Sequence, residues 1–445
     1  MERSKALGED EISTLIWKFS LPAIVGMVVN ALYNVVDSIF VGHGVGEIGL
    51  AAVTIAFPIM IILMAFGMLV GVGASAVVSL RLGQHKQEDA EKILGNAFTL
   101  AAILAVTLSA GLLFFLDPIL ISLGAQPNVL PYARDFTRII LLGSIFMYIG
   151  FGLNNIVRAE GNPRMAMLTV LISAALNIVL NPLFIFTFDL GISGSALATV
   201  VSQGVSAIWV LVYFLGEKSL LKLRISNLFL DKQIVMSIFE IGLSPFLMQL
   251  AASVVTVVFN YSLLKFGGEL AVASIGIINR IAMLMLMPIF GLSQGIQPII
   301  GYNYGAKNYS RVTKTLKIGI YIGTIFATIG FLIVELFDKQ IMMLFNDNPE
   351  LISIGAQGMR LQLCMLPVIG FQIIGANYFQ AVGKAGYAIV LSMSRQVILL
   401  IPLILILPGW LGLNGAWLAS PIADLASAIV TGLFLFKEFR QLGIM

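Results

Sequence analysis

The chain has 445 residues, of which 59% are apolar and only 11% are charged, and its mean hydropathy is +0.98. Soluble domains carry about a quarter charged residues, so this composition could not cover a water-exposed surface. The formal charge of +3 is too small to indicate nucleic acid as a partner, and one cysteine with two histidines excludes disulfide frameworks and Cys/His metal clusters. We expect an integral membrane protein without a cofactor.

Twelve apolar stretches, each long enough to cross a bilayer core about 30 Å thick, follow one another along the chain. Charged residues or clusters of Gly, Pro and Asn separate them. The stretches fall near residues 13–40, 52–80, 93–116, 136–158, 163–187, 193–216, 234–264, 272–301, 315–337, 355–382, 387–408 and 413–436. The pattern predicts an all-α fold with twelve transmembrane helices, six before a gap and six after it.

The two halves of the chain match each other at an offset near 222 residues. Gly46 falls on Gly268, each followed by Glu, and residues 191–194 fall on 412–415. Any single match could arise by chance because glycine is common here, but several matches in order at a nearly constant offset indicate a duplication.

The duplication predicts two six-helix lobes, residues 1–216 and 234–445, joined by a charged cytoplasmic linker at 217–233. With six spans in each half, both halves enter the membrane in the same orientation, so a pseudo-two-fold axis along the membrane normal should relate them. Two such lobes are expected to enclose a cleft, and rocking that opens the cleft to alternate sides is the usual mechanism of this architecture.

The distribution of positive charge predicts the orientation. If the N-terminus is cytoplasmic, 19 of the 26 Lys and Arg residues fall on its side of the membrane and five on the other. This bias follows the positive-inside rule. We therefore expect a multi-pass protein of the plasma membrane with both termini in the cytoplasm.

The first span contains the clearest candidate for function. Asp37 lies within it, and Asn30, Tyr33 and Asn34 recur at helical spacing on the same face. An ionisable group in lipid costs several kcal/mol unless it is paired, hydrated or protonated, so this stripe should face the interior of the lobe. A structural polar network that holds helices together is the alternative interpretation.

Other polar residues of the first half could surround this acid, on the fourth, fifth and sixth spans. Their amide and hydroxyl oxygens suit either Na⁺ or a proton-bearing hydrogen-bond network, and packing between helices is a further interpretation of each one. They are Asn154, Asn177, Asn181, Thr199 and Ser202.

In the second half, Asp424 in the last span could reach Arg395 in the eleventh, because these helices are antiparallel neighbours and both residues fall toward mid-depth. We expect a structural ion pair, with a contact to substrate as the alternative.

Several segments together resemble the multidrug and toxic compound extrusion (MATE) family, and most of all its MepA-like branch. The resemblance covers essentially the whole chain, including the duplication. It is carried by LPAIVGMVVNALYNVVDSIFVG in the first span, RAEGNPRMA and ALNIVLNPLFI around the fifth, GISGSALAT in the sixth and SRQVILLIPL in the eleventh.

The resemblance implies an efflux pump that exports organic, often cationic and amphipathic compounds in exchange for H⁺ or Na⁺. The ion-binding positions of the family fall here on Asp37, Asn154, Asn177, Asn181 and Thr199, and its hinge proline falls on Pro22. Some members carry a second acid where this chain has Asn181, so a single carboxyl is left to carry the cation. A lone buried carboxyl can carry a proton without a partner acid, which favours H⁺ over Na⁺; no other metal is expected.

Two other functions compete with this interpretation. A flippase for lipid-linked sugars would need several basic residues in its cavity, where only Arg280 and Arg395 are candidates. An intramembrane enzyme would need a nucleophile with a base or a metal site, and the spans contain no histidine and no paired carboxylates. We expect a non-enzymatic transporter, monomeric, whose partners are small organic molecules and membrane lipid.

Overall fold

The computed structural model describes residues 2–443, apart from the side chains of residues 2–5 and Asn34, and helices are the regular secondary structure of this part of the chain. The prediction of an all-α fold is confirmed. The chain divides into two compact units, which are described one at a time.

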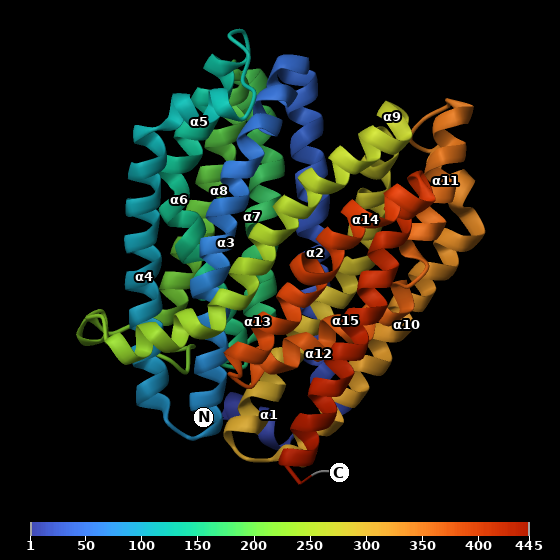
Figure 1. The fold of residues 1–445 in the computed structure, drawn as a ribbon. Helices are drawn as coiled ribbons and strands as arrows, with labels where there is room; N and C mark the ends of the chain where they lie inside the picture. The colour runs from blue at the N-terminus through green and yellow to red at the C-terminus, as the bar shows by residue number, and fades with distance from the viewer. Residues whose placement is uncertain (1, 444–445) are drawn as a thin grey trace. The chain divides into compact units, whose positions relative to one another are not determined.

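Unit 1 comprises the chain up to Asp10 and Val25–Phe246. Within it, α6 packs against α3, α4 and α8, and α7 packs against α8 (Figure 1). Its helices are α1 (Glu2–Glu9), the C-terminal part of α2 (Ile12–Gly44), α3 (Glu47–Gly83), α4 (Gln87–Phe114), α5 (Leu116–Ser122), α6 (Leu130–Ala159), α7 (Pro163–Pro182) with the π-helical turn η1 (Leu183–Thr187), α8 (Gly191–Leu215), η2 (Ile225–Asn227) and the start of α9 (Lys232–Gly305).

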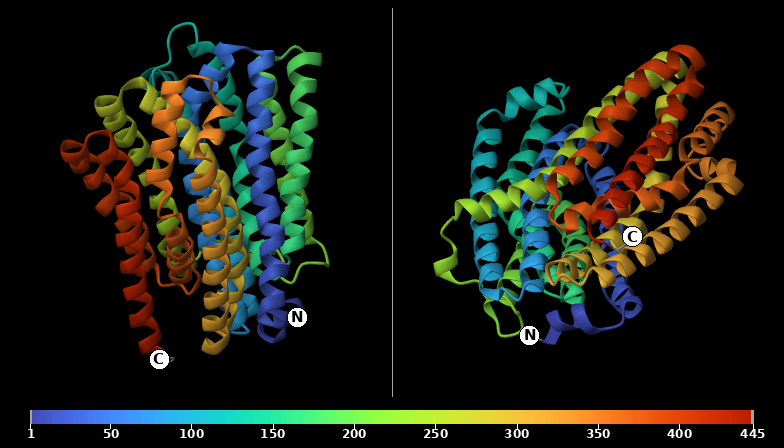
Figure 2. Two further views of the ribbon diagram at one scale, coloured as in Figure 1. Left: turned by 90° about the vertical axis from the view of Figure 1, so that its right-hand side faces the viewer. Right: turned by 60° about the horizontal axis from the view of Figure 1, so that its bottom comes forward.

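Unit 2 comprises Glu11–Ile24 and the chain from Leu247 onward. A core cluster that includes the buried Trp417 joins its helices, with α12 packed against α10 and α15 (Figure 2). They are the N-terminal part of α2, the rest of α9, α10 (Tyr309–Met343), α11 (Pro349–Leu363), α12 (Leu366–Ala381), α13 (Ala385–Met393) with the π-helical turn η3 (Ser394–Leu400), α14 (Ile401–Leu411) and α15 (Leu413–Gln441).

The compact units differ from the predicted lobes at the start of the first long helix of each half. Residues 11–24 of the first half belong to unit 2, and the start of α9, through Phe246, belongs to unit 1. At the repeat offset of 222 these two segments correspond to each other. Each half of the chain therefore contributes the start of its first long helix to the other unit.

Close backbone packing holds both exchanged helix starts. A Cβ atom added to Gly73 would lie 2.2 Å from the carbonyl oxygen of Ile238 in unit 1, and one added to Gly295 would lie 2.5 Å from the Cα of Ser20 in unit 2. Gly73 and Gly295 correspond in the repeat, so equivalent glycines permit an equivalent close contact between helices in each unit. Small residues permit such close approach between helices in a membrane, where dispersion contacts replace the hydrophobic effect.

The spans can be compared with the twelve predicted ones. Ten helices of the described chain are long and apolar enough to cross a membrane, and eleven if α11 and α12, bent by 46°, form one span. Helix α9 has 74 residues, roughly 110 Å of helix, and its geometry breaks at Gly268 between the predicted spans 234–264 and 272–301. The predicted number of twelve is reached when α9 is counted as two spans.

The backbone dihedral angles also match between the two halves of the chain. Gly46, between α2 and α3, has φ 78° and ψ −160°, and Gly268 has φ 69° and ψ −167°. His85 and Lys307, also 222 residues apart, have φ of 60° and 58°. Matching positions thus adopt matching rare conformations, as expected when the two halves share one ancestral fold.

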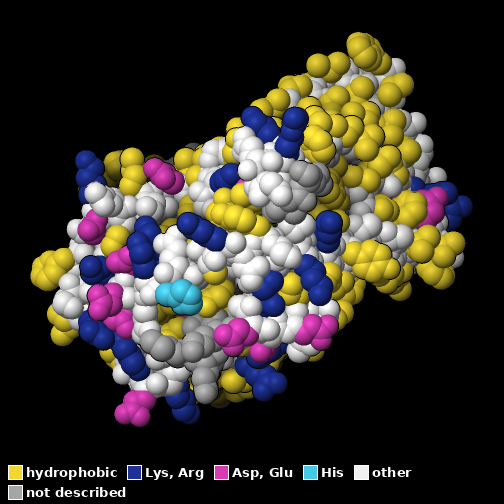
Figure 3. Space-filling model, turned by 90° about the horizontal axis from the view of Figure 1, so that it is seen from below, with side chains coloured by type: hydrophobic (Ala, Val, Ile, Leu, Met, Phe, Trp, Pro, Cys, Tyr) yellow, Lys and Arg dark blue, Asp and Glu magenta, His cyan; other side chains and the backbone are white. Residues whose placement is uncertain are grey.

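The linker is hydrogen-bonded to α4 and to Glu160 of unit 1. Asn96 of α4 donates to the carbonyl oxygens of Asn227 and Phe229 at 3.3 and 3.2 Å, and Thr99 donates to that of Leu228 at 2.8 Å. The buried carboxylate of Glu160 accepts hydrogen bonds from Ser219 and from the backbone of Leu221. Figure 3 shows Lys and Arg side chains spread over the face seen from below.

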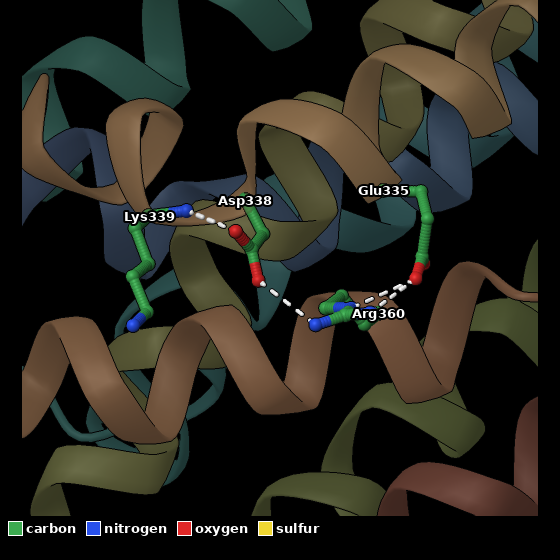
Figure 4. Close-up of polar contacts among 4 residues, drawn as sticks. All are labelled: Glu335, Asp338, Lys339 and Arg360. Atoms are coloured by element: carbon green, nitrogen blue, oxygen red, sulfur yellow. Dashed lines mark hydrogen bonds and ion pairs between the residues drawn. The ribbon is translucent and has the colours of Figure 1, made fainter.

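In unit 2, an ion-pair cluster spans a kink in α10. Helical geometry is lost at Phe337, with φ −125° and ψ 23°. Arg360 of α11 contacts Glu335 on one side of the break and Asp338 on the other, the latter at 3.9 Å (Figure 4). The Arg360 side chain is 51% exposed, so we assign this pair no more than the roughly 0–1 kcal/mol of a surface salt bridge.

We predict that Gly268→Ala lowers the stability of the protein by about 1–3 kcal/mol, because its φ and ψ lie in a region that only glycine occupies readily. A Cβ there would meet nothing within 4 Å, so the loss would come from the backbone alone. Thermal unfolding of the detergent-solubilised protein measures it. Gly276→Ala, at a helical glycine that is equally open, is the control and should not lower the melting temperature; equal melting temperatures would contradict the prediction.

Candidate functional site

The carboxylate of Asp37 lies where α2, α7 and α8 meet in unit 1. It is partly buried, and its Oδ1 accepts hydrogen bonds from Asn181 Nδ2 and, at 3.2 Å, from Ser195 Oγ. Both donors are neutral, and among the described residues no Lys, Arg or His forms a salt bridge with it. The described contacts of this carboxylate therefore bring no positive charge to it.

A chain of side chains extends the site along α7 and α8. Asn181 Nδ2 lies 3.5 Å from Asn177 Oδ1, and Asn177 Nδ2 donates to Thr199 Oγ1 at 3.2 Å. The hydroxyl of Tyr33 is hydrogen-bonded to Thr199. Tyr33 and Asp37 on α2, like Asn177 and Asn181 on α7, are four residues apart, so each pair lies on one face of its helix. The structure therefore brings Tyr33, Asp37, Asn177, Asn181 and Thr199 into one network.

Local backbone geometry allows the three helices to meet there. Pro182 follows Asn181 and removes a backbone donor, and the chain continues as the π-helical turn η1. Glycines at the end of α2 and near the start of α8 pack closely against this turn. A Cβ atom added to Gly44 would lie 2.2 Å from Ile185 Cγ2, and one added to Gly194 would lie 2.8 Å from the backbone of Phe184. π-helical turns occur often at functional sites, where they redirect side chains.

Two of the predicted residues do not join this network. Asn154 Nδ2 donates to the carbonyl oxygen of Ala166 at 3.2 Å, and Ala166 lies 11 residues before Asn177 on α7, roughly 16 Å along the helix. The Oδ1 of Asn154 is buried without a hydrogen-bond partner among the described residues. Ser202 donates to the carbonyl oxygen of Ala198 on its own helix at 2.7 Å.

The remaining predicted residues of the first span are spread out. Asn30 is exposed, and the side chain of Asn34 lies outside the described residues. Pro22 is buried in the segment of α2 that belongs to unit 2. Of the predicted stripe, Tyr33 and Asp37 have side-chain contacts in the network.

Ser195 belongs to the site, and the sequence analysis did not single it out. It precedes Thr199 by four residues in the segment GISGSALAT, so the two share a helix face. That spacing was a usable signal. A serine in an apolar helix often bonds its own backbone, however, and only the packing of α8 against α2 shows that this one reaches Asp37.

The site can accept a cation through oxygen atoms. Asn181 Oδ1 is buried and has no hydrogen-bond partner among the described residues, and the Asp37 carboxylate lies beside the same side chain. Carboxylate and amide oxygens are the ligands that hard cations take in proteins, and the same carboxylate can accept a proton. No group of three His, Cys, Asp or Glu side chains that could hold a metal occurs in the described chain.

In unit 2 the structure brings Arg395 and Asp424 together. Arg395 Nε on η3 lies 2.6 Å from Asp424 Oδ1 on α15. Asp424 is only 4% exposed. A charge-assisted hydrogen bond of this length is among the stronger polar contacts in proteins.

Comparison with known proteins identifies what this arrangement resembles. The MatE family model matches residues 22–183 and again residues 245–406, two copies that coincide with the sequence repeat. The multidrug export protein MepA of Staphylococcus haemolyticus (strain JCSC1435) is 27% identical over 433 residues, 97% of this chain and 95% of that protein.

Two solved structures extend the match to the whole fold. The MATE multidrug transporter DinF-BH, solved in complex with a ligand, is 42% identical with a TM-score of 0.90, covering 97% of each chain. A MATE structure in the bent conformation is 27% identical with a TM-score of 0.94, covering 100% of this chain and 98% of the other. The resemblance seen in the sequence is confirmed.

We predict that Asn181→Asp creates a Na⁺-stabilised protein. The new carboxylate would lie at hydrogen-bonding distance from Asp37, and two ionised carboxylates so close repel each other unless a cation lies between them. Na⁺ at about 100 times its dissociation constant would add about 2.7 kcal/mol of stability. The measurement is the melting temperature in NaCl against choline chloride at alkaline pH.

Asn154→Asp serves as the matched control, because its neighbour is a backbone carbonyl and no second carboxylate is in contact with it. The same Na⁺ response in the wild type, the control and Asn181→Asp would show that residues 37 and 181 are not adjacent.

Proposed function

This chain belongs to the MatE family of multidrug efflux transporters, and we propose that it exports organic, often cationic and amphipathic compounds in exchange for a cation that binds at Asp37. The observation that carries the proposal is the absence of a positive partner for Asp37 among the described residues, together with two neutral donors that hold it in place. A carboxylate inside a span is stable only with a proton, a metal cation or water beside it.

The exchange follows from this geometry. With a cation bound, the carboxylate is neutralised and Asn181, Ser195 and the Asn177–Thr199 pair keep it in position. Once the cation leaves, a cationic compound can take its place, because both neutralise the same charge. Competition of this kind couples downhill entry of the cation to uphill export of the compound, provided that the site opens to alternate sides.

We propose H⁺ as the coupling cation, with Na⁺ as the alternative. The network contains one carboxylate, and at residue 181 it has an amide whose Nδ2 donates toward Asp37. A donor pointing at the carboxylate takes up one of the lone pairs that a metal ion would use, whereas a proton needs only one oxygen.

Alternating access requires a place where the fold can bend, and we propose Pro22 as a hinge. Helix α2 contains residues of both units, which divide between Ile24 and Val25, and Pro22 lies two residues before that division. A proline inside a helix removes a backbone hydrogen bond and permits a kink. A structure similar to this chain is described in a bent conformation.

We place the transporter in the plasma membrane with both termini in the cytoplasm, on the basis of the Lys and Arg distribution. Its partners would be small organic molecules and lipid, and it would act as a monomer without a cofactor. An organic dye with a positive charge has the chemistry of the proposed substrates and is suitable for testing. The flippase alternative gains no support, since Arg395, one of its two candidate residues, is paired with Asp424.

We predict that Asp37→Asn reduces ion-driven transport to the level of empty vesicles, because an amide cannot gain or lose a cation. Efflux of a cationic dye from proteoliposomes under an imposed pH or Na⁺ gradient is the measurement. Asp189→Asn changes an exposed carboxylate outside the network and should leave transport unchanged. Wild-type efflux by Asp37→Asn, at equal protein in the membrane, would refute the assignment.

A further inference from the structure

Asp424 is a buried carboxylate of unit 2 that the proposed mechanism does not use. It lies 11 residues, roughly 16 Å, into α15, and Arg395 lies 10 residues, roughly 15 Å, into the span that starts at Ala385. Because these antiparallel helices enter from opposite sides of a core about 30 Å thick, both residues lie near mid-depth. Charged side chains at that depth are expensive and are functional candidates by default.

The pair lies on the two spans of its half that correspond to those carrying the polar partners of Asp37. In the first half, Asn181 is on the fifth span and Ser195 and Thr199 are on the sixth; in the second half, Arg395 is on the fifth and Asp424 on the sixth. With residues 191–194 falling on 412–415, Asp424 falls on Gln203, about one turn beyond Thr199. Both fifth spans also contain a π-helical turn, η1 and η3.

Asp37 and Asp424 differ in the charge of their hydrogen-bond donors. Asp37 accepts hydrogen bonds from an amide and a hydroxyl, both neutral. Asp424 accepts its hydrogen bond from a guanidinium at 2.6 Å, and arginine keeps its proton under all physiological conditions. The charge of Asp424 is thus already balanced, by a cation that is part of the chain and cannot leave.

We propose that Arg395 is a tethered cation, which permanently occupies the carboxylate site of unit 2 and leaves unit 1 as the only place where a cation is exchanged. This inference rests on the proposed function, and it adds a stoichiometry to it: one coupling cation for each transport cycle. It also assigns Asp424 as a latent cation site, available only when the guanidinium is removed.

A neighbouring polar atom indicates what a freed Asp424 would use. Ser427, about one turn further along α15, has a buried Oγ without a hydrogen-bond partner among the described residues. A hydroxyl oxygen close to a carboxylate suits H⁺ or Na⁺.

The test counts cations bound by purified full-length protein in detergent, H⁺ by acid–base titration and Na⁺ by equilibrium dialysis. Arg395→Gln should bind one more cation per protein than the wild type, because Asp424 loses its tethered partner. The double variant Arg395→Gln with Asp424→Asn should bind as many as the wild type, and it replaces the ion pair by a neutral amide pair that can still form a hydrogen bond.

Two results would overturn the proposal. Equal cation binding by Arg395→Gln and the wild type would show that Asp424 is no latent site. Fewer cations bound by the double variant than by the wild type would show that Asp424 exchanges a cation even with Arg395 present. If Arg395→Gln does not fold, the double variant alone still decides the second point.

Asp37→Asn in the same assay separates this inference from the proposed function. One cation fewer than the wild type supports exchange at Asp37. An unchanged count refutes the role of Asp37, while the Arg395 variants report independently on the tethered cation.

Discussion

A carboxylate in the hydrocarbon layer of a membrane needs a group or ion that neutralises its charge. The two units of this protein differ in the hydrogen-bond donors that they supply to their buried carboxylates. Asp37 is held by an amide and a hydroxyl, and the proposed mechanism assigns a mobile cation to its charge. Asp424 is held by a guanidinium, so its charge is met within the chain. The cost of an unpaired intramembrane charge, several kcal/mol, makes this difference decisive for which site can take part in exchange.

The duplicated fold supplies the setting for this contrast. Matching rare backbone conformations at Gly46 and Gly268, and matching helix crossings at Gly73 and Gly295, show that both halves keep one architecture. The side chains placed on that architecture have diverged. In the proposed arrangement, one exchangeable and one tethered cation neutralise the two carboxylates, and only the exchangeable one responds to substrate. Helix α2 carries both the acid, in unit 1, and the proposed hinge proline, in unit 2.

Hydropathy and the repeat predicted the helical membrane fold, since long apolar stretches have few alternatives in a bilayer. Asn181 and Asp37 were predicted to be neighbours from their residue types and the family resemblance, and they are in contact. Spacing along one helix fixes which residues share a face, but it does not fix which neighbour that face meets. This limit explains why Asn154 was placed with the network although it bonds to Ala166, and why Ser195 was missed. The exchange of helix starts between the units also depends on contacts distant in sequence, which local patterns do not contain.

The central claim is that Asp37 changes its protonation when a transported compound binds. Infrared difference spectroscopy of the purified protein, before and after addition of a cationic dye, measures this most directly. The account predicts that the carbonyl stretch of a protonated carboxyl group disappears on dye binding in the wild type, and that this change is absent from Asp37→Asn. Dye binding without any change in a carboxyl band, or with the same change in Asp37→Asn, would contradict it.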